Sequence, residues 1–110
     1  MVESSAHNLD YIFQALSDPT RRSILKKITR RERAVGEIAE SYSMSLAAIS
    51  KHIQSLDRAG LIIRRKEGSF SYIKLNPEAM NSADKWLEFY RVFWKESLNS
   101  LKNFIESEDT

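Results

Sequence analysis

Residues 35–60 read VGEIAESYSMSLAAISKHIQSLDRAG, and this stretch decides the fold. Its apolar residues recur at helical spacing in two groups, the first being Val35, Ile38, Ala39 and Tyr42 and the second Leu46, Ile49, Ile53 and Leu56. Ser45 is placed to cap the second helix, and Gly60 to close it as a left-handed residue. Two short helices joined by a few residues are typical of a helix-turn-helix, although periodicity alone fits any pair of packed helices.

Two further helices are expected before this pair. Apolar residues at helical spacing predict the first over about residues 8–16. Asp18 followed by Pro19 signals the start of the second, because the carboxylate accepts backbone N–H bonds and proline needs none at that position. This second helix is expected to run to about Arg30, and the polar residues 30–33 are expected to form a connection.

A β-hairpin is expected after Gly60. Residues 61–66 and 69–75 are two β-prone runs on either side of Glu67-Gly68, where glycine can close the turn. One arm is basic and the other rich in hydroxyls, which suits a wing along DNA phosphates but also fits a solvated hairpin end. The register of the two strands stays open.

The last segment predicts one long helix. Asn76-Pro77-Glu78 is a start signal, and no breaker follows before about Ile105. Its apolar residues exceed a single stripe, so the helix needs cover on more than one side. A partner subunit related by two-fold symmetry is the economical cover, and an apolar ligand groove is the alternative.

Composition narrows the class of protein. The 110 residues contain no Cys, which excludes disulfides and thiolate chemistry and favours a cytoplasmic protein. No run is apolar enough for a membrane span or an export signal. Residues 1–75 hold 13 Lys and Arg against 8 Asp and Glu, whereas residues 76–110 hold 4 against 7, so the basic charge precedes the last segment. Catalytic motifs are absent, and we expect no enzyme activity.

Nearly the whole chain, from Asn8 to about Ile105, resembles the ArsR-type winged-helix repressors. The resemblance is carried by FQALSDPTRRSIL at residues 13–25, VGEIA at 35–39, MS at 44–45, ISKHI at 49–53, Leu56 and AGL at 59–61. The late Asn76-Pro77 and the aromatic stretch at 86–94 resemble a branch without metal sites. The resemblance implies a mainly α fold with a small β-hairpin, a winged helix-turn-helix that dimerises through its first and last helices. We therefore expect a single domain over residues 1–110, with a DNA-binding core at 8–76 and a dimerisation helix at 77–106.

The resemblance also implies that the helix after Ser45 enters the major groove. On its outer face Lys51 suits guanine, Gln54 suits adenine, and Ala47 or Ala48 suits a thymine methyl group. Ser45, Ser50 and Arg58 are better placed for phosphates. His52 lies on the flank of the helix, where it either bonds within the core or touches DNA. The predicted DNA-binding residues are Ser45, Ala47, Ala48, Ser50, Lys51, His52, Gln54, Ser55, Arg58, Arg64, Arg65, Lys66 and Ser69.

Dimer contacts are expected from the first and last helices, at Leu9, Phe13, Trp86, Tyr90, Phe93, Trp94, Leu98, Leu101 and Ile105. Relatives that sense metals carry Cys in the third helix or Asp and His pairs in the last. This chain has no Cys and no His in its last helix, so we expect no metal site and no cofactor. The predicted function is a homodimeric, sequence-specific regulator of transcription that binds double-stranded DNA, most simply a repressor at an imperfect palindrome. The alternative is a winged-helix module that binds another protein and not DNA.

Overall fold

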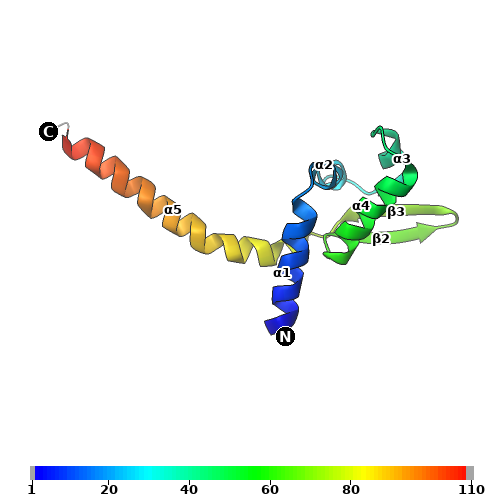
Figure 1. Ribbon diagram of the computed structural model, residues 1–110, viewed down its shortest axis with the longest axis horizontal. Helices are drawn as coiled ribbons and strands as arrows, with labels where there is room; N and C mark the ends of the chain where they lie inside the picture. The colour runs from blue at the N-terminus through cyan, green and yellow to red at the C-terminus, as the bar shows by residue number, and fades with distance from the viewer. Residues whose placement is uncertain (1, 109–110) are drawn as a thin grey trace.

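The computed structural model describes residues 2–108, and it describes side chains from residue 9 onward. The elements, in chain order, are α1 (Val2–Leu16), α2 (Pro19–Ile28), β1 (Arg33–Ala34), α3 (Val35–Glu40), α4 (Leu46–Arg58), β2 (Ile62–Glu67), β3 (Phe70–Leu75), the 3-10 helix η1 (Pro77–Ala79) and α5 (Met80–Glu108). Helices α1 to α4 and the hairpin form one body, from which α5 leaves as a long arm (Figure 1). The arm makes the molecule 69 Å long but only 21 Å thick.

The predicted helix ends of the body are confirmed at three positions. The Asp18 carboxylate accepts the backbone N–H of Arg21 at 3.0 Å and so caps α2. Ser45 caps α4 in the same way, because its hydroxyl accepts the N–H of Ala48 at 3.1 Å. Gly60 follows α4 with a φ of 74° and donates to the carbonyl of Asp57, which is the left-handed ending that glycine favours.

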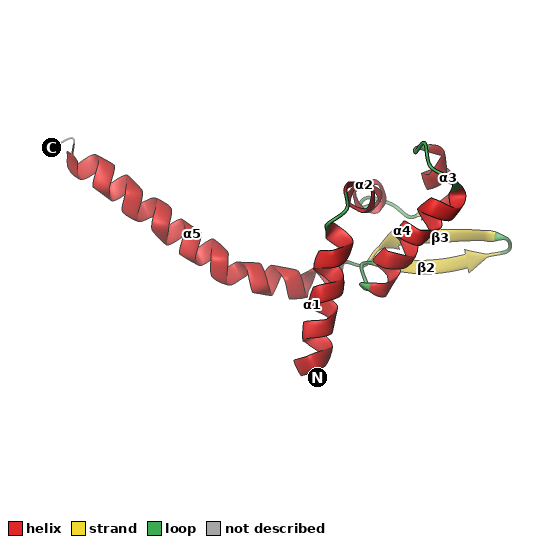
Figure 2. Cartoon of the chain, viewed as in Figure 1, coloured by secondary structure: helices red, strands yellow, loops and turns green. Residues whose placement is uncertain are grey.

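The hairpin belongs to a three-stranded antiparallel sheet in the order β1-β3-β2. Glu67 pairs with Phe70 at the tip and Ile62 with Leu75 at the base, which fixes the register that the sequence left open. Strand β1 was not predicted, since residues 30–33 were expected to be a connection. It has only two residues, which pair with Ile73 and Tyr72 of β3. The strand exists through this pairing and not through a local pattern. The two longer strands, β2 and β3, form the hairpin beside α4 (Figure 2).

One apolar core holds the body together, with contributions from every helix and from the sheet. Its fully buried large side chains are Ile12, Ile24, Ile28, Ile38, Ile49, Ile53, Leu56, Leu61 and Ile73. Burying such side chains stabilises a fold by about 1.5–3 kcal/mol each. Three of them lie along one side of α4, so the core fixes which face of that helix points outward.

Some predicted bounds were wrong. Helix α1 begins at Val2 and not near Asn8, α2 ends at Ile28, and the last segment opens with η1 before α5. The side chain of Asn76 does not cap that segment. Its amide donates instead to the carbonyl of Gly60 at 2.9 Å, where α4 ends and polar backbone groups lack helical partners.

Candidate nucleic-acid interface

The outer face of α4 carries the polar side chains that were predicted to read bases. Ala47, Lys51, Gln54 and Arg58 are exposed, and they lie opposite the side of α4 that the core buries. Ala48, Ser50 and Ser55 flank them and are half-buried. Within the described part of the chain, Lys51, Gln54 and Arg58 form no side-chain hydrogen bond or ion pair. Their donors are therefore available to an external partner.

A groove lies between the start of α4 and the wing. Its volume is about 310 Å³, and it is lined by Val35, Gly36, Leu46, Ser50, Arg64, Ser69, Phe70 and Ser71. Three hydroxyls and a guanidinium thus gather where α4 approaches β2 and β3. Leu46 belongs to the apolar group that predicted this helix, but unlike Ile49, Ile53 and Leu56 it is 59% exposed. As the first residue of α4 it overhangs the groove instead of packing beneath the helix.

The two faces of the wing differ in what they offer. Side chains of successive strand residues point to opposite faces. Arg64 and Lys66 share the face of Ile62 and Ile73, which is the face toward the helices, and Lys66 has no ion pair with any described residue. Arg64 lies 3.7 Å from Asp57 and lines the groove.

Arg65 points to the other face of the sheet, where it is held within the subunit. It donates to Glu32 at 2.7 Å and to Glu67 at 2.7 Å, and it lies 4.5 Å over the ring of Tyr72. The bond from Arg65 holds the pKa of Glu32 below its usual range, and Glu32 with Glu67 raises the pKa of Arg65. Arg65 was predicted to contact DNA, but the structure gives it internal partners, because the strand register directs it away from α4.

His52 also has internal neighbours. Its Nδ1 lies 3.3 Å from Nη1 of Arg21 and 3.7 Å from the carboxylate of Asp18. The pKa of Asp18 is lowered, chiefly by the backbone N–H of Arg21 and further by His52. Of the two alternatives that the sequence left open, the geometry favours the bond within the subunit.

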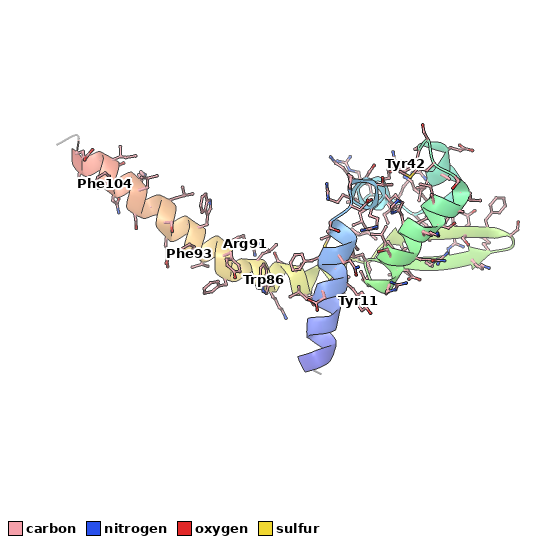
Figure 3. The ribbon with its side chains drawn as sticks, in the orientation of Figure 1. Tyr11, Tyr42, Trp86, Arg91, Phe93 and Phe104 are labelled. Carbon is pink, nitrogen blue, oxygen red and sulfur yellow. The ribbon has the colours of Figure 1, made fainter. Side chains whose placement is uncertain are left out.

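The arm presents an apolar surface that its own subunit does not cover. Ala83 is the only buried residue of α5, and every residue from Asp84 to Glu108 is exposed. The exposed large apolar side chains are Trp86, Leu87, Phe89, Tyr90, Val92, Phe93, Trp94, Leu98, Leu101, Phe104 and Ile105. These side chains project along the whole arm (Figure 3). All predicted dimer contacts on α5 are among them.

The predicted contacts on α1 differ from each other. Phe13 is 36% exposed and meets Trp86 of α5, whereas Leu9 is partly buried against the core of its own subunit. An open apolar hollow of about 530 Å³ lies on α5 among Leu87, Tyr90, Arg91, Phe93 and Trp94. Arg91 forms ion pairs with Asp84 and Glu88 of the same helix.

Among the side chains that the structure describes, those of residues 9–108, no group of three or more His, Cys, Asp or Glu is arranged to hold a metal ion. No helix in the described range is long and apolar enough to cross a membrane.

Sequence reasoning missed Leu46 and Phe70 as candidate contacts. Phe70 is 62% exposed at the wing, and both residues border the groove beside α4. The position of Leu46 directly after the capping Ser45 was a usable signal, because a residue in the first turn can overhang the end of a helix. Phe70 carried no such signal, since a β-prone aromatic is expected in any strand.

Comparison with known proteins gives consistent matches. A family model described as a helix-turn-helix domain matches residues 16–65. The transcriptional repressor SdpR of Bacillus subtilis is 34% identical over 79 residues, which are 72% of this chain and 88% of SdpR.

Solved structures extend these matches to the fold. A crystal structure of an ArsR family transcriptional regulator is 33% identical, has a TM-score of 0.76, and is matched over 82% of this chain and 93% of its own. A solution structure from Mycobacterium bovis is described as a homodimeric winged helix-turn-helix DNA-binding domain. It is 25% identical, has a TM-score of 0.64, and is matched over 86% of this chain and 84% of its own.

Proposed function

Because the chain belongs to the ArsR family of winged helix-turn-helix transcriptional regulators, we propose that it binds double-stranded DNA as a homodimer and represses transcription at an imperfect palindrome. The family consists of regulators, and the chain is not an enzyme. The observation that carries the proposal is the outer face of α4, where Lys51, Gln54 and Arg58 are exposed and have no hydrogen-bond or ion-pair partner among the described side chains. Repression follows the relative SdpR, which is named a transcriptional repressor.

In the proposed complex, α4 lies in the major groove. Lys51 donates to guanine and Gln54 pairs with adenine, because these side chains match the donor and acceptor patterns of those bases. Arg58, Ser45 and Ser50 bind phosphates, and the wing adds Arg64, Lys66 and Ser69. Arg65 is left out of the contact set because it is directed to the face of the sheet away from α4 and is bonded to Glu32 and Glu67 there. His52 is left out because its Nδ1 faces Arg21 within the subunit.

Dimerisation supplies the second recognition helix. A two-fold dimer on DNA holds its two recognition helices about 34–36 Å apart, so that both enter the major groove on one face of the duplex. The apolar stripe of α5 and the exposed edge of Phe13 support an interface between copies, and the Mycobacterium bovis structure is homodimeric. An exposed apolar surface of this extent is unfavourable in a monomer.

We further propose that the regulator acts in the cytoplasm and does not respond to metal ions. Its support is the lack of Cys throughout the chain and the lack of a metal-holding cluster among the described side chains, residues 9–108. Zinc or cadmium at stoichiometric concentration, or a chelator, should leave the DNA affinity unchanged. A tenfold shift would contradict this part of the proposal.

The proposal is tested by selecting bound fragments from genomic DNA with the purified protein and measuring the affinity of the selected duplex by fluorescence anisotropy. With roughly 6–10 phosphate contacts, the logarithm of the binding constant should fall with the logarithm of salt concentration at a slope of about −5 to −9. A slope near zero, or no preferred sequence, would refute it. That result would favour the alternative function, a module that binds protein through the aromatic arm.

A further inference from the structure

Arg21 occupies the junction of three helices. Its Nε donates to the carbonyl of Ala15 at 2.8 Å and its Nη2 to the carbonyl of Gln14 at 2.9 Å, both at the end of α1. Its Nη1 points to Nδ1 of His52 in α4 at 3.3 Å. The guanidinium is planar and rigid, so these three contacts fix the helix ends relative to one another.

We propose that Arg21 is a positioning residue that sets the rotation of α4 through His52 and thereby couples the dimer-forming helices to the DNA-reading face. This inference rests on the proposed function. His52 follows Lys51 directly and precedes Gln54 by two residues, so any turn of α4 about its axis moves all three side chains together. Fixing the position of the His52 imidazole therefore also fixes the positions of Lys51 and Gln54, the side chains proposed to read bases.

The contacts form a continuous path from the arm to α4. Trp86 of α5 meets Phe13 of α1 at 5.4 Å between ring centroids. Phe13 is adjacent to Gln14, whose backbone carbonyl accepts a hydrogen bond from Nη2 of Arg21. Nη1 of the same guanidinium lies 3.3 Å from Nδ1 of His52 in α4. Displacement of α1 by the assembly of the arms is therefore transmitted to α4 by hydrogen bonds and not only by apolar packing.

The contact between Arg21 and His52 requires an unprotonated Nδ1, because only a ring nitrogen without a proton can accept a hydrogen bond from a guanidinium. A proton on Nδ1 removes the acceptor and places two cations side by side. Asp18 is the only carboxylate within ion-pair distance of His52 among the described side chains, and at 3.7 Å it offsets part of this repulsion. The carboxylate of Asp18 also accepts a hydrogen bond from the backbone N–H of Arg21.

The proposal makes a prediction of sign that a DNA contact would reverse. If His52 touched phosphates, acidification would strengthen DNA binding, because a positive charge would be added at the interface. If His52 accepts from Arg21, acidification weakens binding.

The experiment compares two arginines that both cap α1. Arg22 donates to the carbonyl of Leu16 at 2.8 Å and forms no described contact with α4, so it is the matched control for Arg21. Lysine keeps the charge in both variants but cannot make three contacts in one plane. Arg21→Lys should lower the affinity for the selected duplex about tenfold, as expected for loss of a charge-assisted hydrogen bond, and Arg22→Lys should change it less than about twofold.

Two substitutions of His52 separate the bond from the packing. His52→Asn places an amide oxygen near the position of Nδ1, accepts without titrating, and should retain affinity within about threefold with no response to acidification. His52→Leu keeps the bulk without an acceptor and should match Arg21→Lys. The wild-type protein should lose more affinity than His52→Asn on acidification. Circular dichroism and sedimentation establish that each variant is a folded dimer before binding is measured.

A DNA-free measurement keeps the inference separate from the proposed function. The nitrogen NMR shifts of the His52 ring should show at neutral pH the tautomer with the proton on Nε2, and Arg21→Lys should shift the amide signals of Lys51 and Gln54. A proton on Nδ1, equal effects of the two lysine substitutions, or stronger binding on acidification would overturn the inference. Failure of the wild-type protein to select any duplex would refute the proposed function, and the NMR result would still decide the role of Arg21.

Discussion

Phe13 and Trp86 meet edge to face, with ring centroids 5.4 Å apart and planes inclined at 69°, close to the point where α5 leaves the body. The pair joins the first helix to the last, yet Trp86 is 46% exposed and Phe13 36% exposed. A contact of this kind contributes about 0.5–1.5 kcal/mol beyond the burial of its area. It orients the arm and leaves the apolar stripe uncovered for a second copy.

Replacing Leu98 and Leu101 by Glu should produce a folded monomer. These side chains are 47% and 55% exposed within the subunit, so its body does not depend on them. Two charges buried without partners at the dimer interface would cost several kcal/mol. Sedimentation should show monomers, circular dichroism should show that the helices are retained, and the DNA affinity should fall at least about 10³-fold, to the nonspecific level.

The control is Asn99→Glu with Asn103→Glu, which adds the same charges on the polar side of α5 and should stay dimeric. Dimers of the leucine variant would place the interface elsewhere.

Lys51→Ala and Gln54→Ala should each change the preferred base at one position. Loss of a good base contact costs about 1–3 kcal/mol of discrimination against the wrong base. Arg58 is a proposed phosphate contact, so Arg58→Ala should weaken binding to all sequences alike. Affinities measured against a panel of single-base variants test this assignment, which is wrong if Arg58→Ala alters base preference and Gln54→Ala does not.

Leu46→Ala should affect recognition while leaving stability almost unchanged. Because Leu46 is mostly exposed, its truncation should change the free energy of unfolding by less than about 0.5 kcal/mol, as at ordinary surface sites. The matched control is Leu56→Ala in the same helix, fully buried, which should cost about 2–5 kcal/mol. Because Leu46 is exposed beside the groove, we predict that it packs on a thymine methyl group of the bound duplex. Replacing that thymine by uracil should weaken the wild-type protein and not the Leu46 variant, and equal losses for both would remove Leu46 from the base-reading set.

The two neighbouring wing cations should behave differently. Lys66→Ala should weaken binding to every sequence and reduce the magnitude of the salt slope by about 1, as expected for one lost phosphate contact. Arg65→Ala should leave the slope unchanged and instead lower the melting temperature slightly, because it breaks the bridge from Glu32 to Glu67. Titrations at several salt concentrations separate the two, and a slope changed only by Arg65→Ala would reverse the assignment of wing faces.

Asp18→Ala should destabilise the fold by about 1 kcal/mol through loss of the α2 cap. The pKa of Asp18 is lower in the folded chain than its ordinary value of 3.8, so its stabilisation is present above that pH and is lost as the pH falls through the folded value. Urea unfolding should therefore show a gap between wild type and variant near about pH 7 that narrows towards pH 2. Asp10→Ala, at an exposed position of α1, is the control and should show no gap. A gap that widens in acid would contradict the cap.

Local signals in the sequence were sufficient for the helices of the body. Asp18, Ser45 and Gly60 act at fixed offsets from the backbone groups that they satisfy, so their roles follow from the chain itself. Strand β1 could not be found in this way, because Arg33 and Ala34 become a strand only when their partners in β3, which lie 40 and 38 residues further along the chain, are alongside. Asn76 failed as a cap for a related reason, since its amide found the carbonyl of Gly60 across the fold.

The candidate interface was predictable where it depends on helical periodicity. Lys51 and Gln54 fall opposite the buried stripe of α4 on any helical wheel. The wing was less predictable, because the choice between Arg64 and Arg65 depends on a register that shifts every side chain to the opposite face with a slip of one residue. The partners of His52 depend on the meeting of α2 with α4, which periodicity within one helix does not contain.

The length of the arm links the regulator to its own abundance. Helix α5 has 29 residues, and only its first turns pack against the body. If the rest is covered by a second copy, ordering of the arm and association are one equilibrium, and the melting temperature rises with protein concentration. Occupancy of the DNA then follows the square of the number of chains while monomers predominate. A cell that halves its supply of this protein would lose about three quarters of the dimers by mass action, so promoter control would respond steeply to dosage.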